Sequence, residues 1–248
     1  MEIKKKWLSE EQFPFTGWNF SHLDNRWDCD KLSWDYKKII QKNLKQNMIL
    51  LDLGTGDGKF LLSLNHPYKN TFVTEGYYPN YELCKKTLLP LGIGVKFIAD
   101  NDLIKYPNEK FDIIINRHES FSIDEIYRTL KSDGIFITQQ VGGLNNNDLS
   151  KKLFPNFTPS YPKNNINHIV PSLLKKGFNI ISQKEEYPKI RFYDIGAFIY
   201  FAKIIKWEFP DFSVKNSINE LNQINLEIEK NGYLEGTEHR YLIVAKKK

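Results

Sequence analysis

The chain has 248 residues, of which 41% are hydrophobic and 26% are charged, and its formal net charge is +5. This length and composition are ordinary for a soluble globular protein that buries a full hydrophobic core, as one domain with additions or as two domains. The modest charge permits an anionic partner without requiring one, because no dense stripe of Lys and Arg occurs. The basic runs Lys4–Lys6 and Lys246–Lys248 are expected to be solvated ends.

The chain shows no disulfide, metal or membrane signal. Its two cysteines, Cys29 and Cys84, are far apart and lack zinc-site spacing, which indicates a reducing compartment. The five histidines show no metal-ligand spacing either, so we expect no metal. The longest apolar stretch, Ile195–Ile205, is too short to span a bilayer and contains Lys203, and no apolar signal core follows the first residues. We therefore expect a cytoplasmic protein without a membrane segment.

Residues 1–47 are expected to form an amino-terminal arm and a helix. Aromatic and polar side chains are interleaved over Phe13–Trp34 with neither helical nor strand periodicity. Two interpretations stay open: this segment lies across a pocket, or it packs as an arm on the edge of a sheet. Asp35–Lys45 then predicts a helix with apolar residues on one face.

The stretch Met48–Phe60 combines an apolar run with a glycine turn. The run is of strand type, and glycines follow it at alternate positions, Gly54, Gly56 and Gly58, before a short amphipathic segment. A strand, a glycine turn and a helix allow the backbone to pass close to a nucleotide-like ligand.

The spacing of these glycines excludes two familiar ligand loops. The dinucleotide fingerprint needs its third glycine at the position of Lys59, and a P-loop needs Ser or Thr at the position of Phe60. What remains is the pattern Asp-x-Gly-x-Gly-x-Gly, which runs from Asp52 to Gly58.

Short apolar strands alternate with helices in the next part of the chain. Strands are predicted at Thr71–Thr74, Val95–Ala99, Phe111–Ile115 and Ile135–Gln140, helices at Asn80–Leu89 and from the capping box Ser122–Glu125 to Leu130, and a turn at Lys131–Gly134. This alternation predicts a doubly wound α/β fold with a parallel sheet and right-handed crossovers.

Polar residues stand where these strands end, at the edge where parallel sheets bind ligands. Glu75 follows the second strand, and its carboxylate can accept both hydroxyls of a ribose. Asp100 follows the third strand, where a side-chain oxygen can meet an adenine amino group. Asn116 and His118 follow the fourth strand, and Gln140 ends the next one. The alternative interpretation of each carboxylate is a solvated group at a strand end.

These motifs resemble the class I S-adenosylmethionine-dependent methyltransferases over residues 48–143. The resemblance implies a mostly parallel seven-stranded sheet whose last strand is antiparallel, and S-adenosyl-L-methionine as the cofactor. It also implies cofactor-binding roles for the matching positions, which are Asp52, Gly54, Thr55, Gly56, Gly58, Glu75, Gly76, Asp100, Asn101 and Asn116.

The carboxyl-terminal part supplies further elements. Strands are predicted at Phe178–Tyr187 and His239–Ala245, helices from Pro171 to Gly177 and at Asn216–Lys230. The aromatic-rich segment Arg191–Phe212 predicts a helical insertion that roofs an acceptor site, extends the core, or does both. The expected domains are the arm and helix at 1–47 and a methyltransferase domain at 48–248, with a helical cap insertion at 190–232.

A general base is needed in methyl transfer only when the nucleophile carries a proton of high pKa. His118 is the first candidate for that base, because imidazole titrates near neutrality, and Glu119 and Asp194 are further candidates. The alternative for His118 is a loop histidine bonded to nearby backbone.

We expect a small-molecule methyl acceptor rather than nucleic acid. The sequence Asn116–Glu119 departs from the Asn/Asp-Pro-Pro-Tyr pattern of enzymes that methylate nucleic-acid amino groups. Neither cysteine lies where the enzymes that methylate C5 of pyrimidines need a thiolate. Two alternatives stay open: an RNA or protein methyltransferase, and a non-catalytic protein that binds S-adenosylmethionine.

Overall fold

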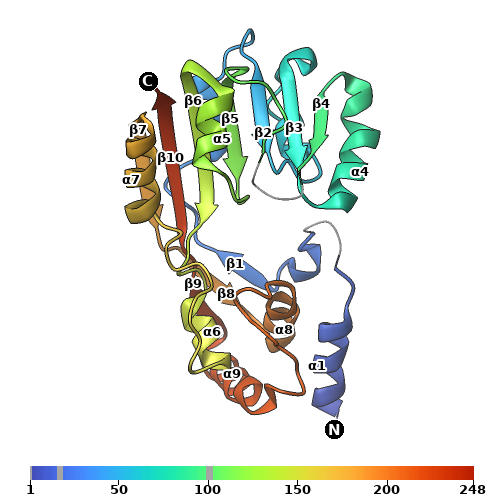
Figure 1. The fold of residues 1–248 in the computed structure, drawn as a ribbon. Coiled ribbons are helices and arrows are strands. Elements are labelled where there is room, and N and C mark those ends of the chain that lie inside the picture. Colours follow the sequence, from blue (N-terminus) through green and yellow to red (C-terminus); the bar gives the residue numbers. More distant parts are fainter. Residues whose placement is uncertain (1, 16–18, 99–102) are drawn as a thin grey trace. The chain divides into compact units, whose positions relative to one another are not determined.

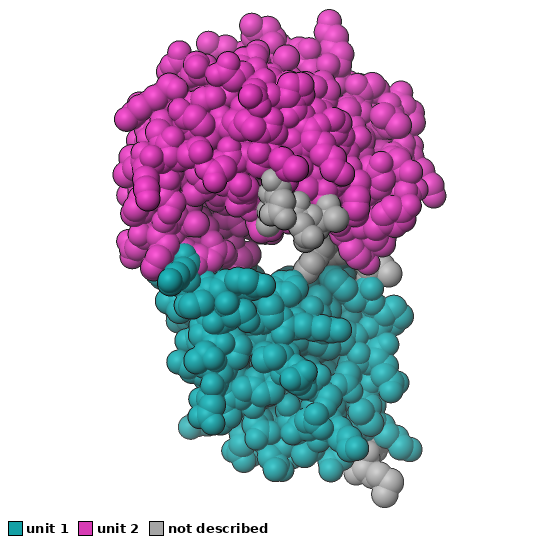
Figure 2. Space-filling model, in the orientation of Figure 1, with its two compact units in different colours: residues 1–32, 142–163, 186–240 teal, residues 33–141, 164–185, 241–248 magenta. Residues whose placement is uncertain are grey.

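The computed structural model describes residues 2–15, 19–98 and 103–248. Trp18 and the two predicted cofactor contacts Asp100 and Asn101 lie outside the described residues. By compactness the chain divides into two units, each assembled from three separate segments and coloured separately in Figure 2. Unit 1 comprises residues 1–32, 142–163 and 186–240, and unit 2 comprises residues 33–141, 164–185 and 241–248.

Unit 2 is built on a seven-stranded sheet with the strand order β4-β3-β2-β5-β6-β10-β7. The first five strands in this order pair in parallel, and Figure 1 shows β10 running against its neighbour β6. The predicted doubly wound, mostly parallel sheet with an antiparallel strand near the end is thereby confirmed. The strands are β2 (Leu50–Leu53), β3 (Thr71–Glu75), β4 (Gly94–Phe97), β5 (Phe111–Arg117), β6 (Leu130–Val141), β7 (Phe178–Glu186) and β10 (Arg240–Lys247).

The central strand β2 is buried along its whole length. Leu51 and Leu53 pack in one cluster with Ile114 of β5 and Phe136 of β6. Burial of every residue, rather than of alternate ones, is typical of a parallel strand that is covered on both faces. The glycine turn therefore starts from a firmly packed strand end at Leu53.

The helices of unit 2 begin with the caps that the sequence supplies. Asp35 accepts the backbone N–H of Lys38, and Ser122 accepts that of Glu125, as side-chain oxygens do at a helix start. The reciprocal bond of a capping box is absent here, because the Glu125 carboxylate binds Arg128 and the N–H of Ile104 instead. The helices are α2 (Tyr36–Asn43), α3 (Lys59–Leu62), α4 (Tyr78–Thr87), α5 (Ile123–Thr129) and α7 (Ile166–Lys176), with 3₁₀ turns at Tyr68–Asn70 and Leu89–Leu91.

Two sequence expectations about these elements are wrong. Helix α7 starts at Ile166 and not at Pro171, because Asn165 caps it by accepting the N–H of His168 and the exposed Pro171 gives up only one backbone bond. The predicted turn at Lys131–Gly134 lies inside β6 as an irregularity of the β5–β6 register.

Unit 1 contains a three-stranded antiparallel sheet in the order β1-β8-β9. The sequence pattern did not predict this sheet, because its strands have only three or four residues each. The elements of unit 1 are α1 (Glu2–Gln12), a 3₁₀ turn (Ser21–Leu23), β1 (Trp27–Cys29), α6 (Asn147–Leu153), β8 (Lys189–Phe192), α8 (Ile195–Ile204), α9 (Ile218–Asn231) and β9 (Leu234–Thr237).

Helix α8 forms the centre of the unit 1 core, with every residue from Ile195 to Ala202 buried. Phe15, Phe20 and Trp27 of the amino-terminal aromatic segment pack against this core, whereas Trp34 belongs to unit 2. The bounds of the two units differ from the predicted boundary at residue 47 and from the predicted insertion at 190–232. The assignment of domains from the sequence stays a prediction.

The described residues contain neither a membrane-spanning helix nor a cluster of metal ligands. No helix within them has the length and apolar character needed to cross a membrane. The same residues contain no group of three or more His, Cys, Asp and Glu side chains that could hold a metal ion.

Candidate functional site

The glycine turn after β2 adopts a backbone conformation that its three glycines allow. Gly54, Gly56 and Gly58 have φ angles of +67°, +64° and +76°, in the left-handed region that favours glycine. The backbone N–H groups of Gly54 and Thr55 both donate to the carbonyl of Thr74, over 3.1 and 3.2 Å. The turn is therefore anchored to the end of the neighbouring strand β3.

The space around each glycine differs. A Cβ atom on Gly54 would lie 2.6 Å from Cβ of Glu119, and one on Gly58 would lie 2.9 Å from the Leu88 side chain. A Cβ atom on Gly56 would meet no atom of the described residues within 4 Å. The turn thus packs against protein at its two ends and faces open space at its middle glycine.

Glu75, at the end of β3, holds the middle of the turn. One carboxylate oxygen accepts the N–H of Gly56 over 2.7 Å and the other accepts that of Tyr77 over 3.0 Å. The thiol of Cys84 donates to the Gly56 carbonyl over 3.2 Å, so both polar groups of Gly56 are fixed. Burial raises the pKa of Glu75, and the backbone N–H groups act in the opposite direction. Each carboxylate oxygen retains a lone pair for a further donor.

Asp52, the first residue of the motif, is a buried carboxyl group on β2. Burial raises its pKa to about 7, while the Thr55 hydroxyl and the positive charge of Arg117 lower it and the charge of Glu75 raises it. Burial thus favours the protonated form of this group, which can donate a hydrogen bond as well as accept one.

Asn116, at the end of β5, is held on several sides. Its backbone N–H and carbonyl both bind the buried Tyr36 hydroxyl, over 3.1 and 2.9 Å. Its side-chain oxygen accepts from Thr138 over 3.0 Å and from Gln140. Its side-chain nitrogen is buried and has no hydrogen-bond partner among the described residues. Since buried donors in proteins are normally satisfied, this nitrogen is a candidate donor to a bound group.

His118 and Glu119 follow β5 directly. His118 has a φ of +63°, and its backbone N–H donates to the Gln139 carbonyl over 2.9 Å. Its Nε2 lies 3.2 Å from the side-chain nitrogen of Gln139. The Glu119 side chain extends over Gly54, and burial together with the charge of Glu75 raises its pKa.

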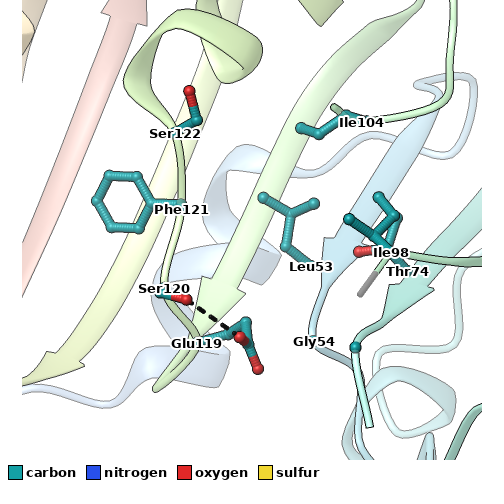
Figure 3. A pocket seen from close by; sticks show the side chains of 10 residues that line it. Leu53, Gly54, Thr74, Ile98, Ile104, Glu119, Ser120, Phe121 and Ser122 are labelled. Carbon is teal, nitrogen blue, oxygen red and sulfur yellow. Dashed lines mark hydrogen bonds between the residues drawn. The ribbon is translucent and has the colours of Figure 1, made fainter. Parts of the chain in front are cut away.

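A cavity of about 100 Å³ lies at this edge of the sheet. Figure 3 shows Glu119 and Ser120 on one side of it and Gly54, Thr74 and Ile98 on the other. The cavity is smaller than the 300–1,000 Å³ that is usual for drug-sized ligands. The Glu119 carboxylate occupies part of the space in front of Gly54, so a ligand larger than this cavity displaces it.

Most of the residues predicted from the sequence meet at this edge in unit 2. They are Asp52, Gly54, Thr55, Gly56, Gly58, Glu75, Gly76, Asn116, His118 and Glu119. Asp194 lies in unit 1, where it caps α8 by accepting the N–H of Ala197 and forms a two-bond ion pair with Arg26. These contacts give Asp194 a structural role, and its catalytic assignment stays a prediction.

Three further residues at this edge were not predicted from the sequence: Cys84, Thr138 and Gln139. Gln139 and Thr138 directly precede Gln140, whose place at a strand end was a usable signal, whereas nothing in the local sequence of Cys84 indicates its place. Trp34 ends the aromatic segment Phe13–Trp34, for which a position across a pocket was one of two interpretations.

No protein-family model matches the chain. One curated relative, a ribosomal protein L11 methyltransferase from Dictyoglomus turgidum, is 30% identical over 159 residues. That match covers 60% of this chain and 44% of the relative, so the chain spans less than half of the relative's length.

Solved structures with a similar fold have low sequence identity to this chain. The YcgJ protein of Bacillus subtilis has a TM-score of 0.57 at 15% identity, over 86% of this chain and 98% of its own. An S-adenosylmethionine-dependent methyltransferase from Mesorhizobium loti has a TM-score of 0.51 at 10% identity, over 85% and 96%. The [4+2]-cyclase SpnF has a TM-score of 0.50 at 15% identity, over 85% and 80%. The shared fold therefore occurs with more than one kind of reaction.

Proposed function

The chain has the fold of the class I S-adenosylmethionine-dependent methyltransferases, and from this premise we propose that it transfers a methyl group from S-adenosyl-L-methionine to a small-molecule acceptor. One observation carries the proposal: the turn at Gly54–Gly58 is anchored to Thr74 and Glu75 and faces open space at Gly56. A backbone held in this way can approach an adenosyl ligand without a side chain between them.

The residues at the sheet edge fit this cofactor chemically. Glu75 offers carboxylate lone pairs to ribose hydroxyls. The side-chain nitrogen of Asn116, which has no partner in the described ranges 2–15, 19–98 and 103–248, can donate to an oxygen. Two carboxyl groups, Glu75 and Glu119, favour a ligand that carries positive charge, because each would have its charge partly neutralised. When bound, the cofactor supplies a methyl group that its positive sulfur has already activated.

The chain's own contribution to catalysis is orientation and exclusion of water. An in-line displacement needs the acceptor atom close to the methyl group and aligned with the carbon–sulfur bond. The rigid strand ends of β2, β3 and β5 supply fixed positions for that purpose.

A protein acceptor is the second candidate, because the curated relative is named for methylation of a ribosomal protein. The match covers less than half of that relative, so its acceptor does not carry over to this chain directly. The cyclase with this fold favours a third alternative, in which the chain binds the cofactor without transferring its methyl group.

The test follows the methyl group itself. The protein is incubated with methyl-labelled S-adenosylmethionine and, separately, with the small-molecule, protein and RNA fractions of a cell extract. Formation of S-adenosylhomocysteine together with label in the small-molecule fraction is the expected result. Label in protein or RNA would replace the small-molecule acceptor by a macromolecular one, and absence of S-adenosylhomocysteine in all fractions would contradict enzymatic transfer.

The control compares two glycines that have the same backbone strain. Gly56 and Gly232 have φ angles of +64° and +83°, and within the part of the chain that the structure describes an added Cβ would meet no atom within 4 Å at either position. Gly56→Ala and Gly232→Ala therefore carry similar folding costs, of roughly 1–2 kcal/mol. We expect Gly56→Ala alone to lose methyl transfer, because its methyl group occupies ligand space. Equal activity of the two variants would place the ligand elsewhere.

A further inference from the structure

We infer that Glu119 is a specificity-determining residue, whose carboxylate makes the site prefer a cofactor with a positively charged sulfur over the neutral demethylated product. The inference rests on the proposed function and adds to it a basis for telling cofactor from product. The place of Glu119 itself follows from contacts within unit 2 alone.

Glu119 is the only ionisable side chain among the described residues that line the cavity at the sheet edge. The rest of this lining consists of glycines, hydroxyl groups and the apolar side chains of Leu53, Ile98, Ile104 and Phe121. Where protein atoms replace part of the surrounding water, the field of a carboxylate is screened less than in bulk solvent. A charge on a ligand in this cavity is therefore sensitive to Glu119.

No cation of the described residues balances this carboxylate. Its Oε1 accepts the Ser120 hydroxyl over 3.3 Å, as Figure 3 shows. The only charged side chain that acts on it within those residues is Glu75, and burial together with this like charge raises the pKa of Glu119. A positive charge on a ligand would lower this pKa again and favour the ionised form. Such a ligand gains the attraction of Glu119 without first breaking an ion pair.

The stem of the Glu119 side chain is fixed against the glycine turn. An added Cβ on Gly54 would lie 2.6 Å from both Cβ and Cγ of Glu119, so the glycine at position 54 makes room for this side chain. The backbone carbonyl of Glu119 accepts the side-chain nitrogen of Gln140 over 2.9 Å. A ligand larger than the cavity can therefore rotate the carboxylate aside, but the charge stays beside the turn.

The cofactor and its demethylated product differ by one positive charge. When the methyl carbon bonds to the electron pair of the acceptor, the carbon–sulfur bond breaks and its electron pair stays on sulfur, which becomes a neutral thioether. The amino-acid and adenosine groups are common to both ligands, so their contacts cancel in the comparison. Because attraction between charges falls only with the inverse of distance, Glu119 favours the sulfonium without having to touch it. The same difference weakens the hold on the product after transfer.

Isothermal titration calorimetry at about pH 8 with S-adenosylmethionine, S-adenosylhomocysteine and sinefungin measures this preference. Sinefungin carries an ammonium group in place of the methylated sulfonium, so it is a second charged ligand. Glu119→Gln keeps the size of the side chain and removes its charge. In this variant we expect the Kd of the two charged ligands to rise by about fivefold or more, and that of S-adenosylhomocysteine to change by less than about twofold. If Glu119→Gln does not fold, Glu119→Ala serves with the same expected order.

The matched control is Glu109→Gln, because the exposed Glu109 precedes β5 whereas Glu119 follows it. The length of this strand separates the two carboxyls by roughly 20 Å, so the control should change each Kd by less than about twofold. An equal rise for all three ligands in Glu119→Gln, no rise for any, or an equal effect of Glu109→Gln would overturn the inference while the proposed function stands. If the natural protein bound none of the three ligands, the proposed function itself would be contradicted.

Discussion

Asp52 is a buried carboxyl group near the end of β2. Burial raises its pKa to about 7. The pKa in the folded chain lies above the ordinary value of 3.8, so the folded state binds this proton more tightly than the unfolded state does. The free energy of unfolding therefore falls as the pH rises from about 4 to about 7.

The prediction concerns Asp52→Asn, which cannot titrate. Relative to the natural protein, the variant should gain stability between pH 4 and pH 7, by at most about 4 kcal/mol at 1.4 kcal/mol per unit of pKa shift. Urea unfolding at several pH values measures this difference. Two parallel curves of stability against pH would show that Asp52 titrates normally.

The buried carboxyl group of Glu208 in unit 1 provides a second prediction about a single residue. Its two carboxylate oxygens accept from Asn145 and Asn146, over 2.7 Å each. In Glu208→Gln, the new NH₂ group would face one of these donors at every pH, which lowers stability by a constant amount of about 1–3 kcal/mol. Burial raises the pKa of the natural carboxyl to about 7, so relative to the natural protein the variant should gain stability in urea unfolding as the pH rises from about 5 to 8.

The control for Glu208 is Glu229→Gln on the exposed face of α9. Glu229 accepts one bond, from Asn225 over 2.7 Å, and a glutamine oxygen can still accept it. This variant should change the free energy of unfolding by less than about 0.5 kcal/mol. A pH-dependent gain of similar size in both variants would mean that loss of a negative charge, and not the burial of Glu208, determines the effect.

At the scale of the elements, the guanidinium group of Arg26 links helices α1 and α8 of unit 1. Arg26 binds Asp194, the cap of α8, over 2.6 and 2.9 Å, and Glu10 of α1 over 2.8 Å. Burial opposes ionisation of both carboxyls, but their hydrogen bonds to Arg26 outweigh it and lower both pKa values. Because the folded pKa values are lowered, this stabilisation is present above pH 4–5 and is lost as the pH falls below it.

Arg26→Lys keeps the positive charge but cannot form the bidentate contact with Asp194. We expect hydrogen exchange to increase in α1 and in the first turn of α8, with exchange in β2 and β5 unchanged. The expected loss of stability is about 1–2 kcal/mol, since the pairs are only half-buried. Unchanged exchange in both helices would show that apolar packing alone holds them.

The sequence predicted those elements whose signal is local. The strand before Gly54, the helix predicted from Asp35 and the cap at Ser122 each depend on residues within a few positions, and the structure contains all three. The start of the helix around Pro171 was wrong because the local cap at Asn165 outweighs the one backbone bond that Pro171 gives up. The turn near Asp133 was wrong because the neighbouring strand β5 decides that conformation. The sheet of unit 1 was missed, because its strands are too short to show a period.

The prediction of the site is limited in the same way, because local patterns do not reveal contacts between distant residues. Gly54–Gly58 and Glu75 could be named because their pattern is continuous along the chain. The contact of Trp34 with Gln139 joins residues 105 positions apart, and no local pattern indicates it. The contact of His118 Nε2 with the Gln139 side chain likewise depends on the fold, so the residue type alone suggested a general base and that assignment stays a prediction.

At the scale of the whole molecule, two compact units are built from interleaved segments of one chain. Unit 2 carries the sheet edge with the glycine turn, and unit 1 carries the aromatic core around α8. The chain passes from one unit to the other several times, so the units cannot be separated by a single cut. Tests of function therefore use the whole chain.

The central claim is that the turn at Gly54–Gly58 binds an adenosyl cofactor, and thermal unfolding with added ligand tests it most directly. S-adenosylmethionine, S-adenosylhomocysteine and NAD are compared, each with the natural protein and with Gly56→Ala. At a hundredfold excess over the dissociation constant, binding adds roughly 2.7 kcal/mol, which for a chain of this size raises the midpoint by roughly 5–10 °C. We expect this rise of the unfolding midpoint for the two adenosyl ligands, and only with the natural protein. No rise with either ligand, or an equal rise in Gly56→Ala, would contradict it.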